Sequence, residues 1–184
     1  MQSFLILALL PALALAQERR EPSDTETGPR GLACKGAAAA LRRATFTLSV
    51  GRVTLRDGRA CVPTGVDTPQ CAFDVTLTAV EPWGKGDRLT VIVNASHAGP
   101  GAWDSVFFYA CRKGVLEQSH ARRYLYGATL SRGANSELVI KSGEWRQGDP
   151  GCCASRERLE YFRWDDPTGK VVLKRTEIRT PVKR

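Results

Sequence analysis

The 184-residue chain is poor in the residues and motifs from which most recognisable active sites are built. Its two histidines, His97 and His120, are spaced neither from each other nor from a nearby cysteine pair as zinc ligands are, so no zinc site is expected. It lacks a Gly-x-Ser-x-Gly elbow and a Cys-x-x-Cys pair, the patterns that indicate a serine hydrolase or a thiol–disulfide oxidoreductase. These absences favour a protein without catalytic residues, metal or other cofactor.

Apolar runs long enough to span a membrane are also missing. Residues 1–16 are uncharged and end in Ala14-Leu15-Ala16, whereas a transmembrane helix needs about 20 apolar residues. The segment is typical of a secretory signal cleaved near Ala16-Gln17, although no Lys or Arg precedes its apolar run; the alternative is a buried N-terminal helix. No cysteine follows the cleavage site to accept a lipid. We therefore expect an exported protein, periplasmic or secreted, with no transmembrane span.

Composition divides the rest of the chain into three parts. Residues 17–31 have almost nothing to bury and are expected to be a disordered leader. Residues 32–180 are long enough for a single β-rich domain with its own core. Residues 181–184 form a basic tail.

Positive charge is concentrated at the C-terminal end. The chain has a formal net charge of +8, and the stretch 170–184 supplies much of it. Such a stretch can attract polyanions weakly and without specificity. It contains no interleaved aromatic residue and the chain has no nucleic-acid motif, so we expect no specific nucleic-acid binding. The alternative is a solvated edge strand and tail.

Six cysteines form an even set, which in an exported chain favours disulfides over metal ligation. Cys61 and Cys71 bracket a turn-rich loop that a local bond would close. The other four cysteines allow three pairings; they are Cys34, Cys111, Cys152 and Cys153. A bond between sequence neighbours needs a strained backbone, so we expect Cys152 and Cys153 each to bond to Cys34 or Cys111. A redox-active Cys152–Cys153 pair is the less favoured alternative.

Hydrophobic periodicity predicts a mainly β fold. Phe73, Val75, Leu77 and Ala79 alternate with polar residues, and the stretch 89–95 repeats that pattern, as expected for two strands of a half-buried sheet. The stretch 106–111 is apolar on both faces, which predicts a central strand. Helical propensity is sustained only over residues 35–43. Further strands are expected at 45–48, 52–55, 115–119, 123–129, 137–142, 156–164 and 170–178.

The expected fold is therefore an antiparallel meander or a two-layer sheet with one short N-terminal helix, stapled by disulfides, and α+β only at the margin.

Two groups of side chains are candidates for a site. Trp83, Trp103, Trp145 and Trp164 are candidates for a platform that stacks against a sugar or peptide, although core packing is the favoured alternative. A hydrolase would act through Asp165, Asp166 or Ser96. The two aspartates stand in a turn sequence that explains them without catalysis.

Several spaced segments resemble exported bacterial proteins of the LppP/LprE lipoprotein type and their uncharacterised relatives. They are 41–48, 51–58, 84–96, 99–109 and above all 149–155, which contains Asp149, Pro150, Cys152, Cys153 and Ser155. The resemblance implies a signal-bearing envelope domain without assigned chemistry. It also implies a calcium-type loop where this chain has 83–88, with one carboxylate beside two cations, so calcium is not expected. The expected function is a non-enzymatic binding or structural module of the envelope with an unidentified partner or ligand.

Overall fold

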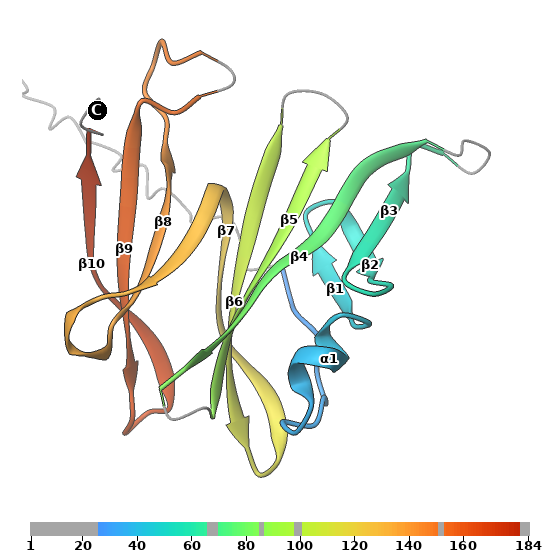
Figure 1. The fold of residues 1–184 in the computed structure, drawn as a ribbon, viewed down its shortest axis with the longest axis vertical. Coiled ribbons are helices and arrows are strands. Elements are labelled where there is room, and N and C mark those ends of the chain that lie inside the picture. The colour runs from blue at the N-terminus through green and yellow to red at the C-terminus, as the bar shows by residue number, and fades with distance from the viewer. Residues whose placement is uncertain (1–25, 66–69, 85–86, 98–100, 151–152, 181–184) are drawn as a thin grey trace, which may run out of the picture.

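The computed structural model describes residues 26–65, 70–84, 87–97, 101–150 and 153–180. The described chain is mainly β, with antiparallel strands and one short α-helix (Figure 1). The elements are α1 (Ala37–Leu41), β1 (Thr45–Leu48), β2 (Gly51–Thr54), β3 (Arg59–Pro63), β4 (Cys71–Trp83), β5 (Arg88–His97), β6 (Ala102–Arg112), β7 (Val115–Arg132), the 3-10 turn η1 (Ala134–Ser136), β8 (Leu138–Glu144), β9 (Arg156–Asp165) and β10 (Lys170–Arg179).

The topology is the simplest an antiparallel sheet can have. Strands β3 to β10 form one eight-stranded sheet in which every strand lies beside its sequence neighbours, and β1 and β2 form a separate hairpin. Short turns make this order possible; Lys113 and Gly114, which connect β6 to β7, both have positive φ, as a tight hairpin requires. The predicted meander with one short helix is confirmed.

Strand β6 lies near the middle of the sheet and is buried on both faces, as the stretch 106–111 predicted. Because successive side chains of a strand point to opposite faces, Phe107 and Tyr109 enter one hydrophobic cluster while Val106 and Phe108 enter another. We call the first the N-terminal core; its buried members include Leu41, Phe46, Leu55, Val75, Leu77, Val91, Val93, Phe107 and Tyr109. We call the second the C-terminal core; its buried members include Trp83, Ile92, Val106, Phe108, Leu125, Ile140, Phe162 and Trp164.

The N-terminal core is covered by segments that precede the sheet in sequence. Helix α1 and the β1–β2 hairpin contribute Leu41, Phe46 and Val53 to it. The helix is shorter than the predicted 35–43; Gly36, just before it, adopts left-handed φ, and no side chain caps it. In Figure 1, α1, β1 and β2 lie on the side of β4 away from the C-terminal strands.

The predicted disordered leader, residues 17–31, is wrong for residues 26–31. Glu26 is only 2% exposed, and its carboxylate accepts hydrogen bonds from Ser49 N at 2.9 Å and Ser105 Oγ at 2.5 Å. Thr27 pairs with Thr47 of β1. The segment is ordered by these long-range contacts, which its own polar composition does not indicate. Residues 17–25 and the tail 181–184 lie outside the described residues.

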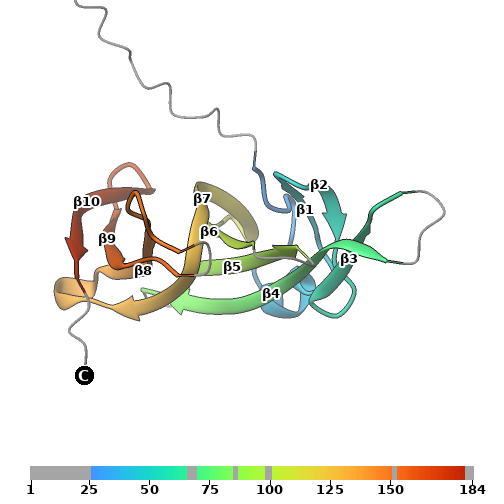
Figure 2. The same ribbon diagram turned by 90° about the horizontal axis from the view of Figure 1, so that it is seen from above.

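The C-terminal core is covered by the sheet itself, because β8, β9 and β10 curl over the other face of β6 (Figure 2). Phe162 of β9 reaches Phe108 of β6 with ring centroids 4.9 Å apart. Where β10 begins, Val171 N donates to Ser119 Oγ of β7 at 3.1 Å, across the curl. Two strand layers thus pack face to face although all the strands belong to one sheet.

The disulfide pairing corrects one prediction. Cys61 bonds to Cys71, as expected, but Cys34 bonds to Cys111, so neither is available to Cys152 or Cys153. Cys34 reaches that position because its N–H donates to Gly114 O at 2.9 Å, beside the end of β6. The segment that carries Cys152 and Cys153 connects β8 to β9, and β7 lies between β8 and β6 in the sheet. Cys153 is disulfide-bonded, and Cys152 lies outside the described residues.

Within the described ranges, no helix is both long and apolar enough to cross a membrane.

Candidate functional site

A hollow of about 650 Å³ lies where β4 ends and β5 begins, next to η1 and β9. We call it the Arg–Trp pocket; its principal lining side chains are Trp83, Arg88, Arg132, Arg163 and Trp164, with Asp87, Asp166 and residues of η1 completing the wall. Its volume lies within the range of about 300–1,000 Å³ typical of small-molecule sites. The pocket is the open end of the C-terminal core.

A β-bulge directs Trp83 into this pocket. The register of β4 against β5 shifts between Leu77 and Ala79. Before the shift Val75 and Leu77 enter the N-terminal core; after it Ala79 and Trp83 contact the C-terminal core. The extra residue of a bulge turns the following side chains to the other face. The predicted common face of Phe73, Val75, Leu77 and Ala79 is therefore wrong for Ala79.

Two tryptophans form an aromatic floor. Trp83 and Trp164 are 2% and 8% exposed and meet edge to face, with ring centroids 5.9 Å apart. Trp83 Nε1–H donates to Ser136 O at 3.1 Å, so η1 fixes the plane of its indole. A buried indole normally has such a partner. The floor is held in place by the core beneath and the η1 wall beside it.

Arg88 joins the floor to the rim. Its guanidinium carbon lies 4.7 Å from the centroid of a Trp164 ring, a cation–π contact. Arg88 Nη2 donates to Asp166 Oδ1 at 2.5 Å, and its Nε lies 3.7 Å from Asp87 Oδ1. The positive charge of Arg88 is therefore balanced by two carboxylates.

The other two arginines have no such balance. Arg132 Nη2 donates to Pro82 O at 2.8 Å, a neutral acceptor. Arg163 is exposed, and within the part of the chain that the structure describes its side chain has no hydrogen bond or ion pair. Two arginines that line the pocket thus have no carboxylate partner among the described residues.

The wall at η1 has an unusual backbone. Asn135 and Ser136 are consecutive non-glycine residues with φ of 57° and 62°. Left-handed conformation costs a non-glycine residue about 1–2 kcal/mol, and such strain concentrates at functional sites. The bond from Trp83 to Ser136 O helps to hold this conformation.

The four predicted tryptophans do not assemble into one platform. Trp83 and Trp164 meet in the Arg–Trp pocket, but Trp103 packs on Phe73 at 5.7 Å and donates from Nε1 to Ser49 Oγ at 3.1 Å. Trp145 is 39% exposed and packs on Tyr126, with ring centroids 5.3 Å apart. Only two of the four side chains share a pocket.

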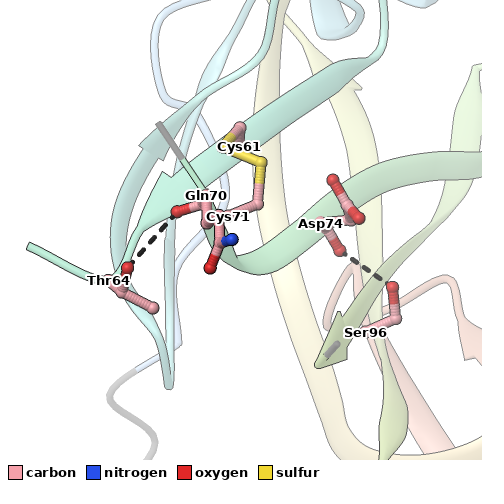
Figure 3. The surroundings of a disulfide bond; sticks show 6 residues. All are labelled: Cys61, Thr64, Gln70, Cys71, Asp74 and Ser96. Carbon is pink, nitrogen blue, oxygen red and sulfur yellow. Dashed lines mark hydrogen bonds between the residues drawn. A yellow bond between two sulfur atoms is a disulfide. The ribbon is translucent and has the colours of Figure 1, made fainter. Parts of the chain in front are cut away.

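The residues of the hydrolase alternative also lie apart. Ser96 Oγ donates to Asp74 O at 3.4 Å, near the Cys61–Cys71 bond (Figure 3). Ser96 and Arg88 stand at opposite ends of β5, eight residues apart, which is about 26 Å along an extended strand. Asp166 binds Arg88, and Asp165 accepts a hydrogen bond from Thr168 within its own turn. These three residues cannot act together on one substrate.

The sequence indicated Trp83, Trp164 and Asp166 as candidates but missed Arg88, Arg132 and Arg163. Each of the three arginines belongs to a strand whose sequence carries no binding motif. Only the curl of the sheet brings them to one place.

No protein-family model, curated protein or solved structure matches the chain.

Proposed function

We propose that this protein is an exported, envelope-associated β domain that binds a small ligand in the Arg–Trp pocket and is not an enzyme. The observation that carries the proposal is the pocket itself, whose floor is fixed by Trp83 and Trp164 and whose rim presents Arg132 and Arg163. Small-molecule sites commonly combine a rigid aromatic surface with a few convergent polar groups.

Export is supported by the sequence of residues 1–16 and by disulfides in the folded domain, because disulfides persist in oxidising compartments. Intact-mass measurement on protein from the periplasm or culture medium tests it directly. We expect a chain that begins at Gln17. A chain found only in the cytoplasm with residues 1–16 attached would contradict export.

Ligand binding is tested by incubating the purified protein with small molecules extracted from bacterial envelopes, followed by gel filtration and mass spectrometry of what co-elutes. The blocking variant is Arg163→Trp, since Arg163 is an exposed strand residue without a partner among the described residues and tryptophan is well tolerated in strands. We expect a compound that co-elutes with the unmodified protein and is lost from the variant.

The matched control is Arg52→Trp, the same substitution at an exposed position of β2. It places an equally large indole outside the Arg–Trp pocket and is expected to retain the compound. Equal retention by both variants would show that the compound binds elsewhere, and no retained compound with any of the three proteins would leave the pocket without a ligand and contradict the proposal.

A further inference from the structure

We infer that the ligand is a small organic oxyanion, with a carboxylate or phosphate group held between Arg132 and Arg163 and an apolar or planar body lying on the Trp83–Trp164 floor. The inference rests on the proposed function, because it names the chemical class that the same pocket accepts.

The first argument for an anionic ligand is the charge of the residues that line the pocket. Three arginines and two aspartates line it, and both aspartates lie against Arg88. Asp166 Oδ1 is 2.5 Å from Arg88 Nη2, so its carboxylate is engaged within the protein. Asp165, the residue before Asp166, accepts a hydrogen bond from Thr168. The positive charges of Arg132 and Arg163 are therefore left for a group from outside the described chain.

The second argument is the geometry of the guanidinium group. Its planar fork of five N–H donors matches the two oxygens of a carboxylate or phosphate. Arg132 uses Nη2 to bind Pro82 O, which holds the side chain, while its other donors have no partner among the residues that the structure describes. Arg163, without a partner among the described residues, has its whole fork available. Arg132 is therefore held in place before an anion binds, whereas Arg163 becomes ordered when it binds. We call these two arginines the clamp.

A neighbouring hollow of about 410 Å³ adjoins the Arg–Trp pocket and shares Arg163, Trp164 and Asp166 with it. It adds Lys174 of β10 and also Asp165, whose carboxylate accepts from Thr168. A ligand whose anionic group lies at Arg163 is thus met by a third cation on the side of β10. Part of the basic C-terminal segment, which its sequence alone left as a solvated strand, thus lines this hollow.

The third argument concerns the part of the ligand that is not anionic, which would contact Trp83 and Trp164. Trp83 and Trp164 are held edge to face and are 2% and 8% exposed, so they offer a ligand a narrow, fixed apolar strip at the base of the pocket. Arg88 stacks on Trp164 and binds Asp166, which makes it a positioning residue that keeps the indole and the turn in place. An inorganic anion would use the clamp but not the floor; an organic oxyanion uses both.

The test is an NMR titration of ¹⁵N-labelled protein that follows the indole N–H signals, with phenylacetate, phenyl phosphate and the neutral phenylacetamide as probes. Phenylacetate and phenylacetamide differ in charge but hardly in shape. We expect saturable shifts of the Trp83 and Trp164 signals with either oxyanion and at least roughly tenfold weaker binding of the amide, from the value of a charge-assisted hydrogen bond. The preferred probe of the two identifies the anion as carboxylate or phosphate.

Arg163→Gln isolates the clamp, because this exposed side chain has no partner among the described residues and its loss leaves the fold intact. We expect roughly tenfold weaker binding of the oxyanions and no change for the amide. Arg43→Gln, at an exposed arginine outside the pocket, is the matched control and is expected to bind as the unmodified protein does.

Three outcomes would overturn the inference: equal binding of amide and acid, unchanged oxyanion binding by Arg163→Gln, or no saturable indole shift with either oxyanion. In each case the proposed function still stands if an envelope compound is retained by the unmodified protein and lost from Arg163→Trp. If no envelope compound is retained and no oxyanion binds, both the proposed function and this inference are wrong.

Discussion

The N-terminal and C-terminal cores lie on opposite faces of the same sheet but are closed in different ways. The N-terminal core is covered by separate segments, which the Cys34–Cys111 bond joins to β6, while the Cys61–Cys71 bond joins β3 to β4. The C-terminal core is covered by the curl of its own sheet, has more buried aromatic side chains and carries the ion pair of the buried Glu160 with the half-buried Arg122. A cover added from elsewhere in the chain closes the whole face, whereas a curled sheet leaves an end open, and the Arg–Trp pocket lies at that end.

The largest expected effect concerns the bond that ties the cover of the N-terminal core to the central strand. Cys34 and Cys111 are 77 residues apart in sequence, against 10 for Cys61 and Cys71. Loop-closure entropy then assigns about 4.5 kcal/mol to the first bond and about 2.7 kcal/mol to the second. We expect the Cys34→Ser/Cys111→Ser variant to unfold at clearly lower denaturant concentration than Cys61→Ser/Cys71→Ser.

Denaturant unfolding of both double variants measures the difference, and a disulfide map of the native protein must accompany it. In that map no peptide containing Cys152 or Cys153 should be linked to Cys34 or Cys111. A stability order in which Cys61–Cys71 matters more would mean that the cover of the N-terminal core is held without its bond.

The second effect tests the ion pair of the C-terminal core. Glu160 is 1% exposed, accepts from Arg122 Nε at 2.9 Å and also binds Arg122 Nη2. Glu160→Gln removes the counter-charge of Arg122, whose side chain is 30% exposed. Because only one partner is fully buried, we expect a loss of about 2 kcal/mol, between the values for exposed and for buried pairs. Urea unfolding is the measurement.

The control for that experiment is Glu157→Gln on the same strand. Glu157 pairs with Lys141 at 2.8 Å, but both side chains are partly exposed. An exposed pair contributes less than about 1 kcal/mol. Similar losses for the two variants would show that burial of Glu160 does not distinguish the C-terminal core.

The third prediction uses the other buried carboxyl group on this face. Burial raises the pKa of Asp104 above its ordinary value of 3.8, although hydrogen bonds from Asn94 and the backbone of Ala128 oppose the shift. The folded protein therefore holds this proton more tightly than the unfolded chain does. The stability that Asp104 contributes is fully present below pH 3.8 and is lost as pH rises through the folded pKa.

We therefore expect the unfolding free energy of the native protein, relative to Asp104→Asn, to fall as pH rises from 3.8 through the raised folded pKa. Chemical unfolding of both proteins across that range measures it. A relative stability that rises with pH would show that the hydrogen bonds to Asp104, and not its burial, control its pKa.

The smallest effect concerns the strained wall of the pocket. Ser136 has φ of 62°, a conformation that glycine adopts without strain. Ser136→Gly should stabilise the fold by about 1 kcal/mol, as read by thermal unfolding. Ser131→Gly, at an exposed position of β7, should instead destabilise it by up to about 1 kcal/mol. A destabilising Ser136→Gly would remove the evidence for strain in the pocket wall.

Features that neighbouring residues determine could be predicted from the sequence, and features that depend on contacts between distant segments could not. The central strand was identified because alternating faces that are both apolar can only be buried on both sides, and β6 is so buried. The Cys61–Cys71 bond was predictable because the ten-residue separation contains a turn-rich loop, which favours the approach of its two ends. The wrong predictions for Cys34 and Cys111 and for residues 26–31 concern contacts between segments whose approach depends on the finished sheet.

By itself the sequence determined most of the strands, their antiparallel pairing, the short helix and the even set of cysteines, because period-two patterns and turn residues act over a few neighbouring positions. It missed β3 (Arg59–Pro63) and divided β7 (Val115–Arg132) into two strands. Only the tertiary structure decided which face each side chain joins after the bulge in β4, and which strands the curl of the sheet brings together. The Arg–Trp pocket depends on both, since Trp83, Arg132 and Arg163 come from three strands far apart in sequence. Twist and bulge geometry accumulate over the whole sheet, so no local pattern records where they bring those side chains.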